Sequence, residues 1–288
     1  MNNENTTKST DNTTLTSDKR RIFDHPFSKA YWKLAAGELG SLKMIIIAAM
    51  LTALRIAIKQ LSIPLDPNRT LKITFGFIIN ATGSMIYGPV VAVIASAISD
   101  TVGAMMSPDP YYFPFIFEEI AGGVLFALFY YRAKLSTTRV MLGRFAVTVV
   151  CNLILNPLIM ISYYRVVLGK TYAFLTLPRL IKNVALFPVQ TLVLILLFNA
   201  LIPITNRMEL TYAGSRKLQI SRSDVITLIS WTIISAAAVA GYILWSTADK
   251  EDPKRPYIAL AALIVILILA GISFCIWKVS KKKANQAG

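Results

Sequence analysis

Polar side chains recur at intervals of four inside one apolar stretch of this sequence. The series is Arg144, Thr148, Asn152 and Asn156, and Pro157, which has no backbone N–H, follows it directly. A spacing of four places side chains on one face of a helix. Within a membrane, such amides either line a cavity or bond to a neighbouring helix. We weigh ligand contact and interhelical hydrogen bonding equally for Asn152 and Asn156, and we expect Arg144 to reach towards the membrane surface.

A second polar group opens a later apolar stretch. Residues 178–183 read Pro-Arg-Leu-Ile-Lys-Asn, and proline favours the first turn of a helix. The free N–H groups of that turn give a helix N-terminus a partial positive charge. Arg179 and Lys182 add to this charge, so we predict an anion-binding site here, with contact to lipid headgroups as the alternative.

Charged residues also lie within apolar stretches earlier in the chain. They are Arg55, Asp100, Glu118 and Glu119. Ionisable groups inside a membrane usually face the interior of a helix bundle, so we expect Arg55 to point inwards. The carboxylates either balance the arginines or accept hydrogen bonds from N–H groups of a ligand.

The apolar stretches lack the groups that catalysis would need. The one histidine, His25, lies in the polar N-terminal segment, so none of the stretches contains a histidine base or metal ligand. The two cysteines, Cys151 and Cys275, form no metal-binding pattern. We expect a protein that is not an enzyme and holds neither a metal nor a cofactor.

Aromatic residues accompany the polar groups. Tyr111, Tyr112 and Phe113 lie in a proline-rich connection at residues 107–114. They suit stacking on a flat heterocycle, and for any one of them the alternative is an interfacial aromatic belt. Together with the cations of residues 178–183, they predict an amphipathic anion with a flat ring, bound near the outer face of the membrane.

Membrane helices must position these residues, because the composition excludes an ordinary soluble protein. Of 288 residues, 55% are hydrophobic and 16% charged, against about 25% charged in a typical soluble domain. A spanning helix takes about 20 apolar residues. Eight spans are predicted, the second short or tilted: 44–63, 74–87, 89–106, 113–131, 141–163, 175–202, 225–245 and 258–277. The fold class is therefore all-α, a polytopic membrane helical bundle.

The formal charge of +15 invites a comparison with nucleic-acid-binding proteins. The positive residues instead gather before the first span, after the fourth, after the sixth and at the C-terminus, which is the pattern of cytoplasmic loops. We predict a multi-pass protein of the cell (cytoplasmic) membrane, embedded in the lipid bilayer, with N- and C-termini in the cytoplasm and no nucleic-acid partner.

Small residues recur at intervals of four on the first span. Ala49, Ala53 and Ala57 share one face, and small residues in this pattern allow close approach of another helix. Internal packing is the common use of such a stripe. Arg55, however, lies roughly 200° around the helix from Ala53, so an inward arginine favours a stripe that faces a partner.

The chain divides into four parts. Residues 1–42 are a polar tail and interfacial segment, 43–203 a six-helix membrane domain, 204–222 a cytoplasmic linker, and 223–288 a two-helix membrane extension.

The order of several short motifs resembles one family. The motifs are residues 31–34, 53–55, 72–77, 87–89, Asp100, 112–114, 152–157 and 178–183. Over roughly residues 30–203 the sequence resembles the folate-family S component, or substrate-binding subunit, of energy-coupling factor (ECF) transporters.

The resemblance implies an S-component-like six-helix core that captures folate or a related vitamin at the external face. The implied partners are a transmembrane coupling subunit and two cytoplasmic ATPase subunits, with Ala49, Ala53 and Ala57 as the docking face. The whole bundle is expected to topple in the membrane to release its ligand inside. The ligand-site candidates are Arg55, Asp100, Phe113, Asn152, Asn156, Arg179, Lys182 and Asn183.

Two features depart from the family pattern. The spans 225–245 and 258–277 are additional to the core, and Glu118 and Glu119 stand where small or hydroxyl residues are expected. Two alternatives stay open: an S component for another vitamin, such as pantothenate or a pyridoxine-type compound, and a membrane scaffold without a transport role.

Overall fold

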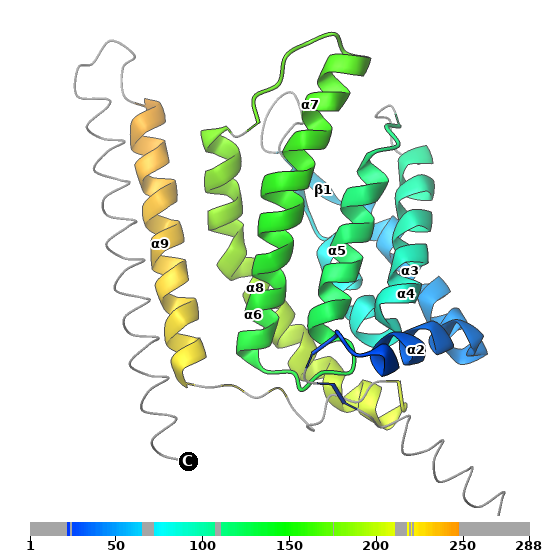
Figure 1. Ribbon diagram of the computed structural model, residues 1–288. Coiled ribbons are helices and arrows are strands. Elements are labelled where there is room, and N and C mark those ends of the chain that lie inside the picture. Colours follow the sequence, from blue (N-terminus) through cyan, green and yellow to red (C-terminus); the bar gives the residue numbers. More distant parts are fainter. Residues whose placement is uncertain are drawn as a thin grey trace, which may run out of the picture.

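The computed structural model describes residues 22–23, 25–64, 72–106, 111–174, 176–210, 218, 220 and 222–247. Within these ranges the chain is a bundle of helices with one small strand pair (Figure 1). The elements are α2 (Lys29–Gly37), η1 (Glu38–Gly40), α3 (Leu42–Gln60), β1 (Ser62–Pro64), β2 (Lys72–Thr74), α4 (Gly76–Met105), α5 (Phe115–Tyr130), α6 (Thr137–Val147), η2 (Thr148–Leu155), α7 (Asn156–Val167), α8 (Leu177–Arg207) and α9 (Arg222–Thr247).

Several of these helices are long and apolar enough to cross a membrane. Four qualify alone in the described part of the chain: α4, the continuous run α6–η2–α7, α8, and α9 as far as Ile243. A fifth candidate is the pair formed by Lys29–Gly40 and α3, which meet at 83°. The predicted all-α membrane class is therefore confirmed, but the predicted number of eight spans is not. In the described part of the chain α5, which covers the predicted span 113–131, has 16 residues and is not among these candidates, and the predicted span 258–277 lies outside the described residues.

The break between the second and third predicted spans falls at Gly88. Both spans lie in α4 as two helical segments on either side of Gly88, whose backbone angles are non-helical, with φ 75° and ψ −178°. A Cβ atom at Gly76 would lie 3.6 Å from the Lys59 side chain and one at Gly103 would lie 3.5 Å from it, so the second segment returns beside the first. A Cβ atom at Gly88 would lie 2.9 Å from the Tyr131 ring. Glycine is required here twice over, because the positive φ disfavours other residues and the tyrosine leaves no room for a side chain.

Proline sets one boundary that the periodicity missed. The predicted span 44–63 ends at Gln60, and Ile63 instead pairs with Ile73 in the antiparallel strands β1 and β2. Residue 63 precedes Pro64, and the proline ring disfavours helical backbone in the residue before it. At the other end of the bundle, α8 continues to Arg207 through Pro203, so the predicted domain boundary at residue 203 lies inside a helix.

Most of the described cationic side chains that do not line the cavity lie at one end of the bundle. Figure 1 shows α2, the α5–α6 turn and the start of α9 at this end. Side chains tie these parts together: the Lys43 Nζ donates to the Met208 carbonyl at 2.5 Å, and Glu38 accepts from the Tyr131 hydroxyl at 2.8 Å. The cations at this end are Lys29, Lys33, Lys43, Arg132, Lys134, Arg139, Arg207 and Arg222. The opposite end of the bundle holds the α7–α8 connection and the start of α8 (Figure 1).

Candidate ligand-binding site

A cavity of about 600 Å³ opens among α3, α4, α5, η2, α7 and α8. This volume is in the range of small-molecule sites. Of the eight predicted ligand-site residues, seven line the cavity: Arg55, Asp100, Asn152, Asn156, Arg179, Lys182 and Asn183. Polar lining residues that sequence reasoning did not select include Lys59, Asn80, Tyr163, Tyr164 and Gln190.

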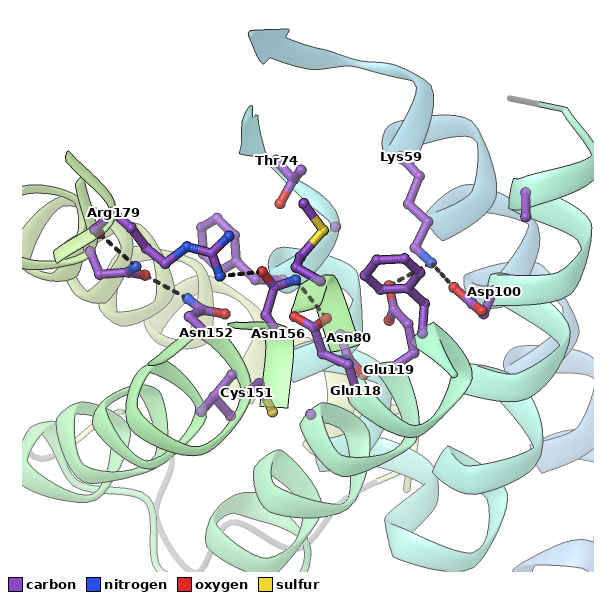
Figure 2. Close-up of a pocket in the computed structure, with 18 of the residues that line it drawn as sticks. Lys59, Thr74, Asn80, Asp100, Glu118, Glu119, Cys151, Asn152, Asn156 and Arg179 are labelled. Carbon is purple, nitrogen blue, oxygen red and sulfur yellow. Dashed lines mark hydrogen bonds and ion pairs between the residues drawn. The ribbon is translucent and has the colours of Figure 1, made fainter. Parts of the chain in front are cut away.

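A chain of hydrogen bonds crosses the cavity from α8 to α5. Arg179, which is 3% exposed, donates to the Asn156 Oδ1 at 2.7 Å. Asn156 in turn donates through Nδ2 to the Glu118 Oε2 at 2.8 Å (Figure 2). Arg179 also donates to the Tyr172 hydroxyl, and its guanidinium lies 5.4 Å from the centre of that ring. The guanidinium is thereby held in one orientation beside the cavity.

A second amide contact runs beside the first. The Asn152 Nδ2 donates to the Asn183 Oδ1 at 2.9 Å, and the Asn183 Nδ2 donates to the Arg179 carbonyl at 2.9 Å. The interhelical hydrogen bonds weighed from the sequence are therefore confirmed, and ligand contact by these asparagines stays a prediction. Asn152 and Asn156 bridge helices, and they also face the cavity.

The span that carries the four-residue polar series changes its helix type. Between α6 and α7, η2 is a π-helix, which turns less per residue than an α-helix. Four residues make slightly more than one full turn of an α-helix and slightly less than one full turn of a π-helix. Over a stretch that contains both, the two angular deviations offset one another. Arg144, Asn152 and Asn156 consequently all line the cavity.

Arg144 does not point in the direction that the sequence predicted. It is 4% exposed, donates to the Gln190 Oε1, and lies 5.1 Å from the centre of the Phe77 ring. It does not reach towards the membrane surface, because the helix begins at Thr137 and Arg144 is two turns inside it.

Charged residues of α3, α4 and α5 form a compact cluster on the other wall. Arg55 pairs with Glu119 and donates to the Ser96 hydroxyl at 3.0 Å. Lys59 lies 2.5 Å from the Glu119 Oε1 and 3.5 Å from the Asp100 Oδ1 (Figure 2). Arg55 points inwards as predicted. Lys59 could have been found from its position one helical turn after Arg55, on the same face of α3.

The two glutamates have different surroundings. Glu119 pairs with both Arg55 and Lys59, whereas the hydrogen bond recorded for the Glu118 side chain comes from Asn156. Among the described residues, five cationic side chains and three carboxylates line the cavity: Arg55, Lys59, Arg144, Arg179 and Lys182, against Asp100, Glu118 and Glu119. Since Asp100 and Glu119 balance the α3 cations, the positive excess lies towards α6 and α8.

Of the three aromatic residues that the sequence suggested for stacking, Tyr111 and Tyr112 line the cavity and Phe113 does not. Phe113 is 57% exposed, packs against Phe117 with ring centres 5.8 Å apart, and is absent from the cavity lining. Its neighbour Tyr112 lines the cavity and lies 5.4 Å, centre to centre, from Tyr163. The ligand-site assignment of Phe113 is therefore wrong, while Tyr112 stays a candidate for stacking on the ring.

The predicted docking stripe lies on the outer surface. Ala49, Ala53 and Ala57 are all exposed, while the opposite face of α3 is buried through Thr52 and Arg55. Figure 1 shows α3 and α9 on opposite sides of the bundle. In the described ranges, no group of three or more histidine, cysteine or acidic residues is placed to hold a metal ion.

Comparison with known proteins gives consistent matches. Residues 40–202 match the family model described as ECF-type riboflavin transporter, S component. The folate transporter FolT of Clostridium novyi (strain NT) is 34% identical over 152 residues, which are 52% of this chain and 84% of the relative. The FolT of Leuconostoc mesenteroides is 28% identical, over 51% of this chain and 80% of the relative.

A third relative and a solved structure agree with these. The FolT of Streptococcus mutans is 33% identical over 132 residues, covering 43% of this chain and 70% of the relative. The crystal structure of FolT bound with folic acid shares 32% identity, over 53% of this chain and 89% of the other, with a TM-score of 0.47.

Proposed function

Because the chain belongs to the family of ECF-type transporter S components, we propose that it captures folate at the outer face of the membrane. It then docks on a transmembrane coupling subunit that carries two cytoplasmic ATPases, which supply the energy for uptake. The subunit binds and hands over its ligand, and it carries out no reaction itself.

The observation that carries this proposal is the distribution of charge in the cavity. Folate joins a flat pterin ring to a glutamate tail with two carboxylates. The cavity offers a positive excess towards α8, where Arg179 and Lys182 line it beside a helix N-terminus. It also offers aromatic side chains at Tyr112 and Tyr163. We assign the carboxylates to the first region and the ring system to the aromatic and amide walls.

Glu118 is the carboxylate best placed to recognise the ring. Glu119 forms ion pairs with Arg55 and Lys59, so its negative charge balances the positive charge of α3. Glu118 faces the cavity and interacts with the amide of Asn156. A carboxylate accepts two parallel hydrogen bonds, and the 2-amino group and ring N–H of a pterin present two donors side by side. In this proposal Glu119 balances the cations of α3, and Glu118 accepts hydrogen bonds from the ligand.

The docking surface is the alanine stripe of α3. The stripe is exposed on the side away from the cavity, and small side chains let a partner helix come close in lipid. Ligand and coupling subunit can therefore contact α3 at the same time, each on its own face.

The cationic end of the bundle faces the cytoplasm in this proposal. The positive-inside rule places α2 and the α5–α6 turn there, with both chain termini, and the start of α8 faces outwards. The protein is thus a multi-pass component of the cell membrane, with a six-helix core that ends with α8 at Arg207, a cytoplasmic linker up to α9, which begins at Arg222, and a second C-terminal span predicted at 258–277.

Equilibrium binding by the purified full-length chain in detergent tests the ligand. Folate, 5-formyltetrahydrofolate, riboflavin and pantothenate would each be titrated while intrinsic tryptophan fluorescence is followed. We expect saturable binding of the two folates and no response to the other two vitamins. Saturable binding of riboflavin or pantothenate alone would replace folate as the substrate. No binding of any of them would favour the scaffold role.

A further inference from the structure

We infer that α9, which lies beyond the residues matched by the family model, positions the ligand-binding end of α8 through the hydroxyl of Ser235. This inference rests on the proposed function, because it concerns the helix turn that carries Arg179, Lys182 and Asn183. Its starting point is a defect that a proline introduces into α8.

Pro188 lies inside α8 and has no N–H group. In an α-helix the amide of residue 188 would donate to the carbonyl of residue 184. That carbonyl, on Val184, therefore has no donor at this position of its own helix. Within a membrane no water replaces the missing bond, and an unpaired carbonyl is costly.

The missing donor comes from α9. The Ser235 hydroxyl lies 2.7 Å from the Val184 carbonyl oxygen, and Ser235 is 4% exposed. The same hydroxyl lies 2.8 Å from the carbonyl of Trp231, but a helix supplies that carbonyl with the backbone N–H of residue 235. We therefore assign the single hydroxyl proton of Ser235 to a hydrogen bond with the Val184 carbonyl.

Further contacts hold α9 in register with this bond. Trp231 packs edge-on against Phe187, with ring centres 5.3 Å apart. Near the start of α9, the Thr138 hydroxyl donates to the Asp224 Oδ1 at 2.7 Å, and Asp224 is buried. Asp224 and Ser235 are eleven residues apart, about 16 Å along a helix, so α9 is fixed to both α6 and α8.

The bond matters for the ligand because of where it lies. Val184 directly follows Asn183, and Arg179 and Lys182 precede it within about one and a half turns. These three residues line the cavity. Fixing the Val184 carbonyl therefore fixes the turn that presents them, on the side of the bundle away from the α3 docking stripe (Figure 1).

A double-mutant cycle on the full-length chain tests this inference. The variants are Ser235→Ala, Pro188→Ala and their combination, with folate affinity and the midpoint of thermal unfolding as readouts. Ser235→Ala should weaken folate binding about threefold, the average size of one interhelical hydrogen bond in a membrane protein. In the Pro188→Ala background residue 188 regains its N–H, so Ser235→Ala should then have no effect. Ser235→Thr, which keeps the hydroxyl, should bind as the wild type does.

Thr232→Val is the matched control. The Thr232 hydroxyl is exposed and bonds within its own helix to the Leu228 carbonyl at 2.8 Å, so its loss should leave folate affinity unchanged. The inference is overturned if Ser235→Ala costs the same in both backgrounds, or if it lowers only the thermal midpoint and not the affinity. A wild-type chain that binds no folate would refute the proposed function instead, while the thermal midpoints would still report whether Pro188 and Ser235 are coupled.

Discussion

Ala53 and Arg55 stand two residues apart on α3 and have opposite surroundings. Ala53 is exposed on a face of small and aliphatic residues, whereas Arg55 is 3% exposed and pairs with Glu119 beside the cavity. One face of the helix carries alanines among aliphatic side chains, and the other holds charge away from lipid. Under the proposed function, coupling and ligand binding would use separate faces of the same helix, and substitutions should affect one without the other.

The largest expected effect is a loss of uptake with binding retained. Ala53→Trp would place a bulky ring in the stripe and keep a partner helix at a distance. Uptake of labelled folate into vesicles that contain the coupling subunit and both ATPases should be abolished, while folate affinity of the isolated chain stays unchanged. Leu196→Trp, at a 61% exposed position on α8, should support normal uptake. Intact uptake by Ala53→Trp would show that α3 is not the docking face.

A substitution at a residue that lines the cavity should instead weaken folate binding. Arg179→Ala removes a buried guanidinium and the hydrogen bonds it donates to Asn156 and Tyr172. Hydrogen bonds to charged groups are worth about 1.5–3 kcal/mol, so folate affinity should fall roughly tenfold to a hundredfold. Calorimetric titration of the isolated chain measures this. Arg207→Ala, at the exposed opposite end of the same helix, should bind normally, and an equal loss in both variants would refute a specific role for Arg179.

A smaller effect separates the two neighbouring glutamates. Glu118→Gln replaces one accepting oxygen by a donating amide, so folate should bind several-fold to tenfold more weakly, as expected for about one neutral hydrogen bond. Glu119→Gln should instead lower the thermal midpoint without ligand, because Arg55 and Lys59 lose the carboxylate that they share. If Glu119→Gln impaired binding and Glu118→Gln had no effect, the assignment of the two residues would be reversed.

The smallest expected effect concerns the aromatic rim. Phe113→Ala should change folate affinity by less than about twofold, because Phe113 lies outside the cavity. Tyr112→Ala should weaken binding more, since that ring lines the cavity and a stacked aromatic contributes roughly 0.5–1.5 kcal/mol. Parallel titrations decide between them, and a greater loss in Phe113→Ala would restore the role that the sequence suggested.

The sequence predicted well where helix geometry alone decides the outcome. The opposite directions of Ala53 and Arg55 follow from a rotation of about 100° per residue, and the break at Gly88 follows from a glycine next to a proline. These features need no knowledge of neighbouring helices, and the structure confirms both.

Features that depend on packing or on helix type were missed. The direction of Arg144 was judged from its distance to the end of an apolar stretch, whereas the helix starts earlier and buries it. The π-helix η2 leaves no mark in a periodicity of four, because its wider turns appear only in the backbone. Neither could a single sequence show that the Ser235 hydroxyl meets the Val184 carbonyl, 51 residues away.

The π-helix makes the cavity wall depend on chain length as well as on residue identity. η2 accommodates its residues in wider turns than an α-helix would. Deleting one residue while the wider turns persist would rotate α7, with Asn156, relative to α6 by somewhat less than the roughly 100° per residue of an α-helix. A single insertion or deletion in this span could thus exchange a whole set of cavity-facing side chains at once. Ligand preference among such subunits could then change in one evolutionary step, without passing through a series of point substitutions.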